Sequence, residues 1–215
     1  MNLLIRHLDK FHDYAVFFLL FILFFVLGII VKLLTNIFSN LFSIEFQTLE
    51  IIWTTFPTLI LILLGLPRLR LLYRTERNRE VNLTLKVMGN QWFWSYQYAD
   101  LPQVEFDSFL TPREILTTGN YRLLEVDNKV ILPINLTTRV LVGSNDVIHS
   151  WALPRLGVKV DATPGRLNQT FIHNSFPGLF FGQCSEICGA NHRFIPIAVE
   201  LVPLSTFKLW LSLFS

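Results

Sequence analysis

Charged residues are scarce in this chain. Of 215 residues only 16% are Lys, Arg, Asp or Glu, whereas about 25% is usual for soluble domains. Hydrophobic residues reach 52% and the mean hydropathy is +0.45. Such an apolar excess is normally hidden in lipid, so a purely soluble protein is not expected. The formal net charge of +2 is too small to predict a nucleic-acid partner.

Two long charge-free runs lie near the N-terminus: Tyr14–Val31 and Ile51–Pro67. The first has 18 residues, and a helix of that length is about 27 Å long, close to the thickness of a bilayer core. A cleaved signal peptide is the alternative for the first run. It is disfavoured because the run is too long and a second apolar segment follows without a small-residue cleavage site.

We therefore predict a transmembrane hairpin over residues 1–80, with a polar lead over residues 1–13 and helices at about 14–37 and 49–73. Two spans place both termini on one side of the membrane. Seven basic residues flank the hairpin ends, and only Lys32 lies in its loop, so the positive-inside rule alone would put the C-terminal part on the inner side. The seven are Arg6, Lys10, Arg68, Arg70, Arg74, Arg77 and Arg79.

Residues 81–215 have a different texture, with short β-type pieces separated by turn signals, which indicates a β-sandwich or a Greek-key barrel. A short C-terminal helix is expected over Leu204–Ser215, capped by Ser205. The expected strands are Asn82–Tyr98, Tyr121–Val126, Val130–Ser144, Gly157–Asp161, Asn168–His173 and Phe194–Val202.

The chain has two cysteines, and Cys184, Cys188 and His192 follow one another at intervals of four. A disulfide is the first alternative for two lone cysteines, but it would not need a histidine at the next interval. A structural zinc site would normally draw four ligands from paired Cys and His clusters. Thiolates and imidazoles on one loop suit copper, and His149 is placed as the upstream ligand of a cupredoxin-type site.

Two thiolates distinguish this pattern from a site for one copper ion. Each sulfur can bridge two metals, so two cysteines and two histidines can hold a copper pair that shares an added electron. Sharing reduces the change in bond lengths on reduction, which favours electron transfer over bond-making chemistry. The sequence shows no nucleophile, acid and base arrangement for independent catalysis.

At these motifs the chain resembles subunit II of mitochondrial cytochrome c oxidase over nearly its whole length. The last of the matching stretches, around the cysteines, is highly specific. The stretches are Met88–Tyr96, Arg122–Asn128, Val147–Ala152, Asp161–Thr170 and Gly182–His192.

The resemblance implies an α+β membrane protein, a transmembrane hairpin followed by a cupredoxin-like Greek-key β-barrel domain. It implies a mitochondrial inner-membrane subunit with the copper domain and both termini facing the intermembrane space, against the positive-inside count. The domain would accept electrons from cytochrome c at a dinuclear copper centre of the CuA type. It would pass them to haem in catalytic subunit I, where oxygen is reduced to water and protons are pumped; other complex subunits would be further partners.

The resemblance also assigns roles to single residues. Cys184 and Cys188 would bridge two copper ions, and His149 and His192 would be terminal ligands. The Glu186 carbonyl would be a weak copper ligand, and its carboxylate would contact magnesium at a subunit boundary.

Two further residues match family positions outside the ligand set. Trp92 matches the aromatic residue where electrons enter, although core or interface packing is the alternative. Glu50 matches a carboxylate at the mouth of a proton pathway, although it could equally be a loop charge.

The chain departs from the family pattern at four positions. Where the family reads His-Ser-Phe-Met-Pro, with methionine as a weak copper ligand, this chain reads Arg193 and Ile195, and isoleucine has no donor atom. Arg68 and Arg155 also replace family serines. Many invertebrate mitochondria read AGA and AGG as serine and AUA as methionine. We hypothesise that the three arginines are serine and that Ile195 is methionine in the protein, lineage-specific substitution being the alternative.

Other functions remain open from the sequence alone. The main alternative is a membrane-tethered copper carrier without an oxidase role. A quinol-oxidase subunit would lack the copper ligands, and nitrous oxide reductase carries a similar copper pair without this hairpin. Acidic residues that could dock a basic cytochrome, or serve only as turn or solvated side chains, are Asp100, Glu105, Asp107, Asp127 and Asp146.

Overall fold

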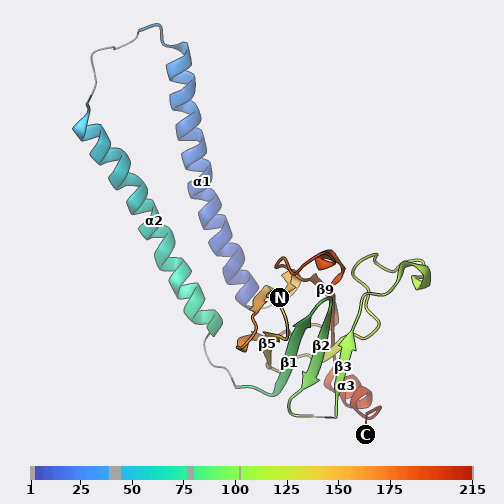
Figure 1. The fold of residues 1–215 in the computed structure, drawn as a ribbon. Coiled ribbons are helices and arrows are strands. Elements are labelled where there is room, and N and C mark those ends of the chain that lie inside the picture. The colour runs from blue at the N-terminus through green and yellow to red at the C-terminus, as the bar shows by residue number, and fades with distance from the viewer. Residues whose placement is uncertain (1–2, 39–44, 77–79, 102, 215) are drawn as a thin grey trace. The chain divides into compact units, whose positions relative to one another are not determined.

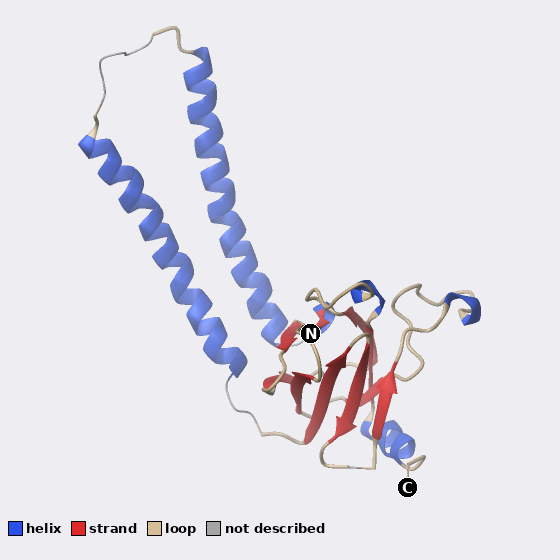
Figure 2. Cartoon of the chain, in the orientation of Figure 1, coloured by secondary structure: helices blue, strands red, loops and turns tan. Residues whose placement is uncertain are grey.

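The computed structural model describes residues 3–38, 45–76, 80–101 and 103–214. The chain forms a helical unit, Arg6–Arg74, and a β-rich unit that consists chiefly of Thr75–Ser215. Figure 1 follows the chain through both units, and Figure 2 distinguishes helices from strands. Arg77 and Arg79 lie outside the described residues.

The helical unit consists of α1 (Leu3–Thr35) and α2 (Gln47–Glu76). Each contains a segment long and apolar enough to cross a bilayer, with hydropathies of 3.1 and 2.0. The large apolar side chains of both segments are mostly exposed, a surface that would be unfavourable in water. The predicted hairpin of two apolar helices is therefore present.

α1 begins at Leu3 rather than near residue 14, so the expected polar lead is helical from that residue on. Charges do not end a helix by themselves, because Arg, Lys and Leu have good helix propensity. No glycine or proline precedes Gly28. α2 likewise begins at Gln47 and continues to Glu76, somewhat beyond the expected limits.

A proline in α2 is compensated by a side chain of α1. Pro67 lacks a backbone N–H, so the carbonyl four residues earlier, that of Leu63, loses its helical partner. The Tyr14 hydroxyl donates a long hydrogen bond of 3.5 Å to that carbonyl. This contact links the N-terminal part of α1 to the C-terminal half of α2.

The largest sheet of the β-rich unit has the strand order β3-β2-β1-β5-β8. β1 and β5 are parallel and the other neighbours antiparallel. The parallel pair aligns Gly89 with Ser144, so the β1–β2 turn lies beside the segment that leads into β6. The strands are β1 (Leu83–Asn90), β2 (Phe93–Tyr98), β3 (Glu105–Ser108), β5 (Thr138–Ser144) and β8 (Asn168–Ile172).

Two smaller sheets complete the unit. One has the order β4-β10-β9 and the other pairs β6 with β7. β9 and β10 are antiparallel, and residues 184–195 connect them. The strands are β4 (Val130–Pro133), β6 (His149–Leu153), β7 (Val158–Ala162), β9 (Gly178–Gln183) and β10 (Pro196–Val202). The short helices are η1 (Arg113–Ile115), η2 (Pro154–Leu156), η3 (His192–Phe194) and α3 (Leu204–Leu211).

Aromatic side chains fill the core between the sheets. Trp94, Trp151, Tyr96 and Tyr98 are all at most 1% exposed. Trp151 Nε1–H donates to the Tyr96 hydroxyl at 3.3 Å, and Tyr98 donates to a backbone carbonyl at 2.7 Å. Burial raises the pKa of both tyrosines, which therefore stay neutral.

Several expected elements differ from the observed ones. Tyr121–Val126 is not a strand: it consists of turns, and only Val126 forms an isolated bridge. The expected strand Val130–Ser144 is split into β4 and β5 around Asn135, whose φ is +60°. Ser205 does not cap α3, because Pro203 precedes the helix and no side chain caps it. β3, β6 and β9 were not expected as strands.

Candidate metal centre

A backbone contact between β9 and β6 holds the candidate metal loop in place. A Cβ at Gly182 would lie 1.8 Å from the carbonyl oxygen of Ala152, so only glycine fits there. Cys184 follows two residues later in the chain, and β6 begins at His149. The contact therefore brings the cysteine loop against the strand that carries the upstream histidine.

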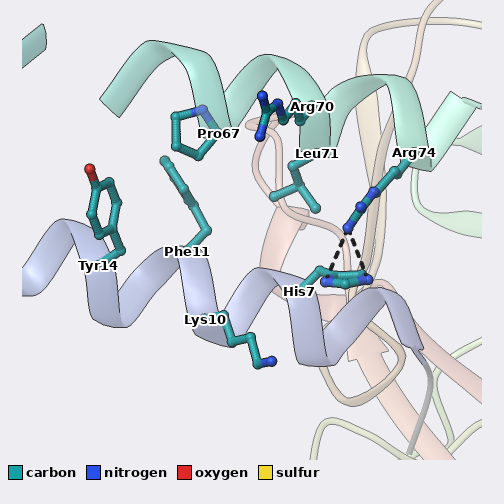
Figure 3. Close-up of a pocket in the computed structure, with 8 residues that line it drawn as sticks. All are labelled: His7, Lys10, Phe11, Tyr14, Pro67, Arg70, Leu71 and Arg74. Atoms are coloured by element: carbon teal, nitrogen blue, oxygen red, sulfur yellow. Dashed lines mark hydrogen bonds between the residues drawn. The ribbon is translucent and has the colours of Figure 1, made fainter. Parts of the chain in front are cut away.

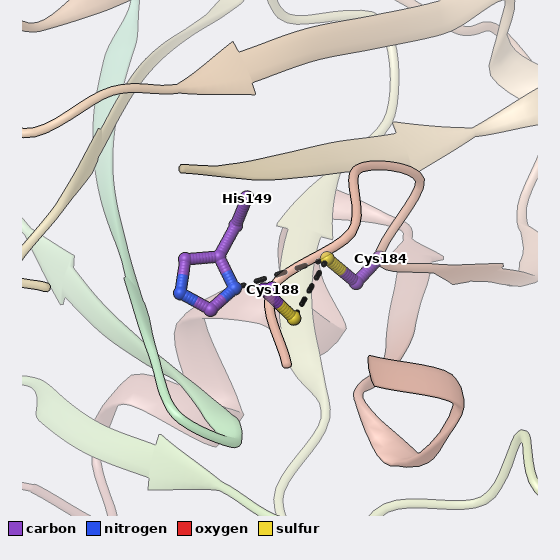
Figure 4. Close-up of side chains that lie close together, drawn as sticks. All are labelled: His149, Cys184 and Cys188. Carbon is purple, nitrogen blue, oxygen red and sulfur yellow. Dashed lines mark hydrogen bonds between the residues drawn. The ribbon is translucent and has the colours of Figure 1, made fainter. Parts of the chain in front are cut away.

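Four candidate donor atoms follow one another in space. His149 Nδ1 lies 3.8 Å from Cys184 Sγ, which lies 3.9 Å from Cys188 Sγ. Cys188 Sγ in turn lies 3.4 Å from the Nδ1 atom of His192. The donor atoms of the first three residues are all within 4.8 Å of one another, and Figure 4 shows these side chains converging.

The sulfur–sulfur distance fits a shared metal and excludes a disulfide. A disulfide bond is about 2.05 Å long, and both cysteines are free. Two sulfurs bound to one ion at about 2.3 Å with a tetrahedral angle lie about 3.8 Å apart. The observed 3.9 Å agrees with that value. Two thiolates and two imidazoles suit copper or zinc by donor type alone.

The site lies just below the surface. His149 is 0% exposed, and Cys184 and Cys188 are 6% and 3% exposed, whereas His192 is half-buried. The Glu186 carbonyl oxygen lies 3.4 Å from Cys184 Sγ and so faces the sulfurs. Glu186 itself is exposed, which leaves its carboxylate open to a partner outside the chain.

Asp146 fixes the orientation of the His149 ring. Its Oδ1 lies 2.8 Å from His149 Nε2, on the side of the ring opposite the sulfurs. A carboxylate at this distance accepts the Nε2 proton, which leaves Nδ1 as the atom with a free lone pair. The same carboxylate accepts the backbone N–H groups of Gln91 and Val147, both at 2.6 Å.

Gln91 connects the two halves of the site. Its backbone N–H bonds to Asp146, and its side-chain Nε2 donates to the Cys188 carbonyl at 2.8 Å. Gly189 makes room for this contact, because its φ is +120° and a Cβ there would lie 3.1 Å from Gln91 Nε2. The sequence did not identify Gln91 as a site residue; its position in the turn after β1, beside Trp92, is the only local signal.

Trp92 lies against the metal loop. Atoms Cζ2 and Nε1 of its ring are 3.3 and 3.4 Å from the position of a Cβ on Gly189, the residue after Cys188. The ring is half-buried, and its Nε1–H is buried without a hydrogen-bond partner among the described residues. The aromatic residue singled out in the sequence is thus in contact with the backbone beside a ligand.

Without metal, the two cysteines ionise unequally. Burial alone would raise the pKa of Cys184, but hydrogen bonds with His149, with the backbone of Glu186 and Ser150 and with His192 together outweigh it and bring the pKa to about 7. Burial and then the charge of Cys184 raise the pKa of Cys188 to about 12. The pair therefore holds one negative charge near neutral pH, and a second thiolate needs added positive charge.

The pKa values of His149 and Asp146 are also shifted. Burial alone would lower the pKa of His149, but contacts with Cys184 and Asp146 raise it. Burial opposes ionisation of Asp146, but hydrogen bonds from His149 and two backbone N–H groups lower its pKa. Asp146 therefore remains an acceptor.

The family methionine position is buried beside the cysteines. Ile195 is 1% exposed and belongs to the same core cluster as Cys184 and Cys188. Its carbonyl accepts the Cys184 N–H at 3.0 Å. Arg193, by contrast, is exposed, with its guanidinium 4.8 Å from the centre of the Phe194 ring.

Most acidic candidates for docking have local hydrogen-bonding roles. Asp100 accepts the Thr84 N–H at 2.6 Å, and Asp127 accepts the Phe109 N–H at 2.8 Å. Asp107 and Glu105 accept from side chains of β2, at 2.6 and 3.2 Å. Glu50 belongs to the helical unit, where it lies exposed in the first turn of α2.

Comparison with known proteins gives one consistent result. The model of "Cytochrome C oxidase subunit II, periplasmic domain" matches residues 83–202, and that of the "transmembrane domain" of the same subunit matches residues 3–71. Cytochrome c oxidase subunit 2 of Drosophila simulans is 51% identical over 209 residues, covering 97% of this chain and 92% of the fly protein. That of Oncopeltus fasciatus is 50% identical over 208 residues, covering 97% and 91%.

A solved structure resembles the β-rich unit. The periplasmic domain of subunit II of cytochrome oxidase (CoxB) of Bradyrhizobium japonicum superimposes with a TM-score of 0.58 at 46% sequence identity. The match covers 62% of this chain and 94% of the bacterial domain.

Proposed function

The chain belongs to the cytochrome c oxidase subunit II family, and we propose that His149, Cys184, Cys188 and His192 are the residues with which it accepts and passes on electrons. It is a membrane-bound subunit of a haem–copper terminal oxidase, an oxidoreductase complex. Its β-rich unit is the copper-binding, cupredoxin-like domain, and other oxidase subunits are its partners. Oxygen is reduced in another subunit.

Two copper ions fit the order of the donor atoms better than one. In the order imidazole, sulfur, sulfur, imidazole, each of two ions would be held by one histidine and by both thiolates. A single ion bound at one end of this series would leave the imidazole at the other end out of reach. When bound, such a copper pair supplies one-electron storage with small changes in bond length.

The chain's own residues do the rest of the work. His149 is presented through Nδ1, because Asp146 holds its Nε2 proton. The Glu186 carbonyl faces Cys184 as a weak further ligand, and the Glu186 carboxylate is free to bind magnesium at a subunit boundary. Ile195 supplies no donor at the position of the family methionine.

Trp92 is the proposed point at which electrons enter. Its ring packs against Gly189, which is covalently linked to the ligand Cys188, so an electron on the ring is a few bonds from a thiolate. Reduced cytochrome c is the proposed donor, and haem in subunit I the proposed acceptor. Asp146 and the two acidic residues of β3, Glu105 and Asp107, offer the negative charge that attracts a basic cytochrome.

We place the protein in the mitochondrial inner membrane, with the copper domain, residues 81–215, and both termini in the intermembrane space. Two membrane-spanning helices require both termini on one side, and about 50% identity to insect subunits supports the mitochondrial assignment. Glu50, in the first turn of α2, then lies at the opposite membrane face, where a proton pathway would begin.

The observation that carries the proposal is the four-atom chain at 3.8, 3.9 and 3.4 Å. Its test is a copper count with an electron paramagnetic resonance spectrum of the purified complex. We expect two copper ions in addition to any copper at the catalytic site, together with a mixed-valence signal. Both the additional copper and the signal should disappear in Cys184→Ser and in Cys188→Ser. Ser185→Ala, an exposed neighbour on the same loop, is the matched control and should retain both.

The alternative, a tethered copper carrier, predicts a different result. A carrier would hold exchangeable Cu(I), which gives no paramagnetic signal, and it would not purify with haem-bearing subunits. Either finding would refute the electron-relay function.

A further inference from the structure

A cavity of about 380 Å³ lies within the helical unit, between the start of α1 and the end of α2. Figure 3 shows Phe11, Leu71, His7 and Arg74 between the two helices, whereas the Lys10 amine is turned away from α2. Four of the eight lining residues are cationic or imidazole side chains, and none is acidic. These four are His7, Lys10, Arg70 and Arg74.

The described residues of this chain do not neutralise the positive charge of the cavity. Among the residues that the structure describes, Lys10, Arg70 and Arg74 form no ion pair with a carboxylate. Arg74 Nη1 instead lies 3.2 Å from His7 Nε2, across the gap between the helices. A guanidinium has donors only, so this contact gives it no negative partner. The cavity therefore favours an anion.

The other half of the lining is mainly apolar. Phe11, Pro67 and Leu71 contribute hydrocarbon surface, and the Tyr14 hydroxyl is turned to the Leu63 carbonyl that Pro67 leaves without a helical partner. A small inorganic anion has no use for such a wall. An amphiphile whose anionic group is joined to a hydrocarbon chain matches both halves.

The depth of the cavity along the helices matches lipid headgroups. The charge-free runs end at Tyr14 on α1 and at Pro67 on α2. Lys10 and Arg70 lie three to four residues beyond those ends, which is about 5–6 Å along a helix. The polar headgroup layer is about 5–8 Å thick on each side of the bilayer, so both cations reach it.

We propose that this cavity binds the phosphate of an anionic phospholipid, with Arg70 and Arg74 as the phosphate ligands and Phe11 and Leu71 against the first acyl carbons. The site shares no residue with the copper centre, because every lining residue belongs to the helical unit. It holds one lipid molecule rather than a diffuse annulus.

The test compares lipid retention by purified oxidase complexes in nanodiscs of phosphatidylcholine with added phosphatidylglycerol, read by native mass spectrometry. The test variant is Arg70→Gln with Arg74→Gln. Lys32→Gln, a lysine at the other end of α1, is the matched control. With about a fivefold effect per cation at a membrane surface, the double variant should bind phosphatidylglycerol roughly 30-fold more weakly, and the control should bind it like the parent.

Copper content and the paramagnetic signal are measured on the same samples and should be unchanged, so failure of this proposal is distinguishable from failure of the electron-transfer function. Equal binding by parent and double variant overturns the proposal, as it would if another subunit fills the cavity. An equal loss of phosphatidylglycerol binding in Lys32→Gln would attribute the effect to surface charge in general, and it would also overturn the proposal. Displacement by millimolar inorganic phosphate would assign the site to the free anion instead.

Discussion

Replacing Asp146 by asparagine tests how the ligand histidine is oriented. The two carboxylate oxygens receive His149 Nε2–H at 2.8 Å and the Gln91 and Val147 N–H groups at 2.6 Å. Asparagine keeps one oxygen and brings an NH₂ group, so at least one of these donors must face another donor, and the remaining donors meet a neutral oxygen that is a weaker acceptor than a carboxylate. If His149 is the one, its proton moves to Nδ1, the atom that faces the sulfurs, and Nδ1 can no longer bind metal.

The size of the effect follows from the bond that is lost. A hydrogen bond to a charged group contributes about 1.5–3 kcal/mol, which corresponds to roughly 10- to 150-fold in affinity. Loss of an outer partner of a metal-bound histidine typically lowers metal affinity about 10- to 100-fold. Asp146→Asn should therefore release copper at a chelator concentration at least tenfold lower than the parent does.

The assay is copper per complex during a chelator titration, with the paramagnetic signal followed in parallel. Asp107→Asn is the matched control, since Asp107 also accepts a short hydrogen bond, from Ser95 Oγ at 2.6 Å, but lies outside the site. Copper retention equal to that of the parent in Asp146→Asn would refute the reasoning. A similar loss in Asp107→Asn would attribute the effect to general negative charge.

Three other predictions follow from the same geometry. Gly182→Ala places a methyl group against the Ala152 carbonyl and should destabilise the domain by about 1–3 kcal/mol or more; the thermal midpoint of copper loss measures this, and an unchanged midpoint contradicts it. Ile195→Met adds a buried thioether beside the cysteines and should shift the reduction potential, and no shift in redox titration would place that side chain away from the metal; peptide mass spectrometry shows whether methionine is already there. In the copper-free protein, alkylation should rise as the pH passes about 7 and modify Cys184 before Cys188, because only the first has a lowered pKa; equal labelling of both would contradict it.

The parts predicted correctly from sequence depended on local patterns. The hairpin is visible as two charge-free runs whose length matches a bilayer, and these runs lie within α1 and α2. Cys184, Cys188 and His192 share a short loop, so their spacing alone brings their side chains close together. His149 was placed by analogy with cupredoxin-type sites, and it lies 3.8 Å from a sulfur in the structure.

The parts that failed depend on contacts between distant residues. All five residues of β6 are buried, so it lacks the alternation of apolar and polar residues that marks a strand with one exposed face. Tyr121–Val126 has strand-forming residues but almost no partner strand, and it forms turns. β propensity alone therefore overestimates strands where no neighbouring strand is available.

The roles of Gln91 and Asp146 in the site also could not be predicted from the sequence. They are 55 residues apart, and the parallel pairing of β1 with β5 brings them together. The sequence predicts for Asp146 only a role as a docking charge or a turn residue. The local sequence around either residue does not indicate the register in which β1 and β5 pair.

The two sulfurs lie 3.9 Å apart, and this short distance also makes the metal-free protein vulnerable to oxidation. Closing them into a cystine needs each to move only about 1 Å, and a bonded pair offers no thiolate to a metal. A newly made chain that meets an oxidant before it meets copper would be locked out of its function. Metal can therefore be loaded only while both thiols are reduced.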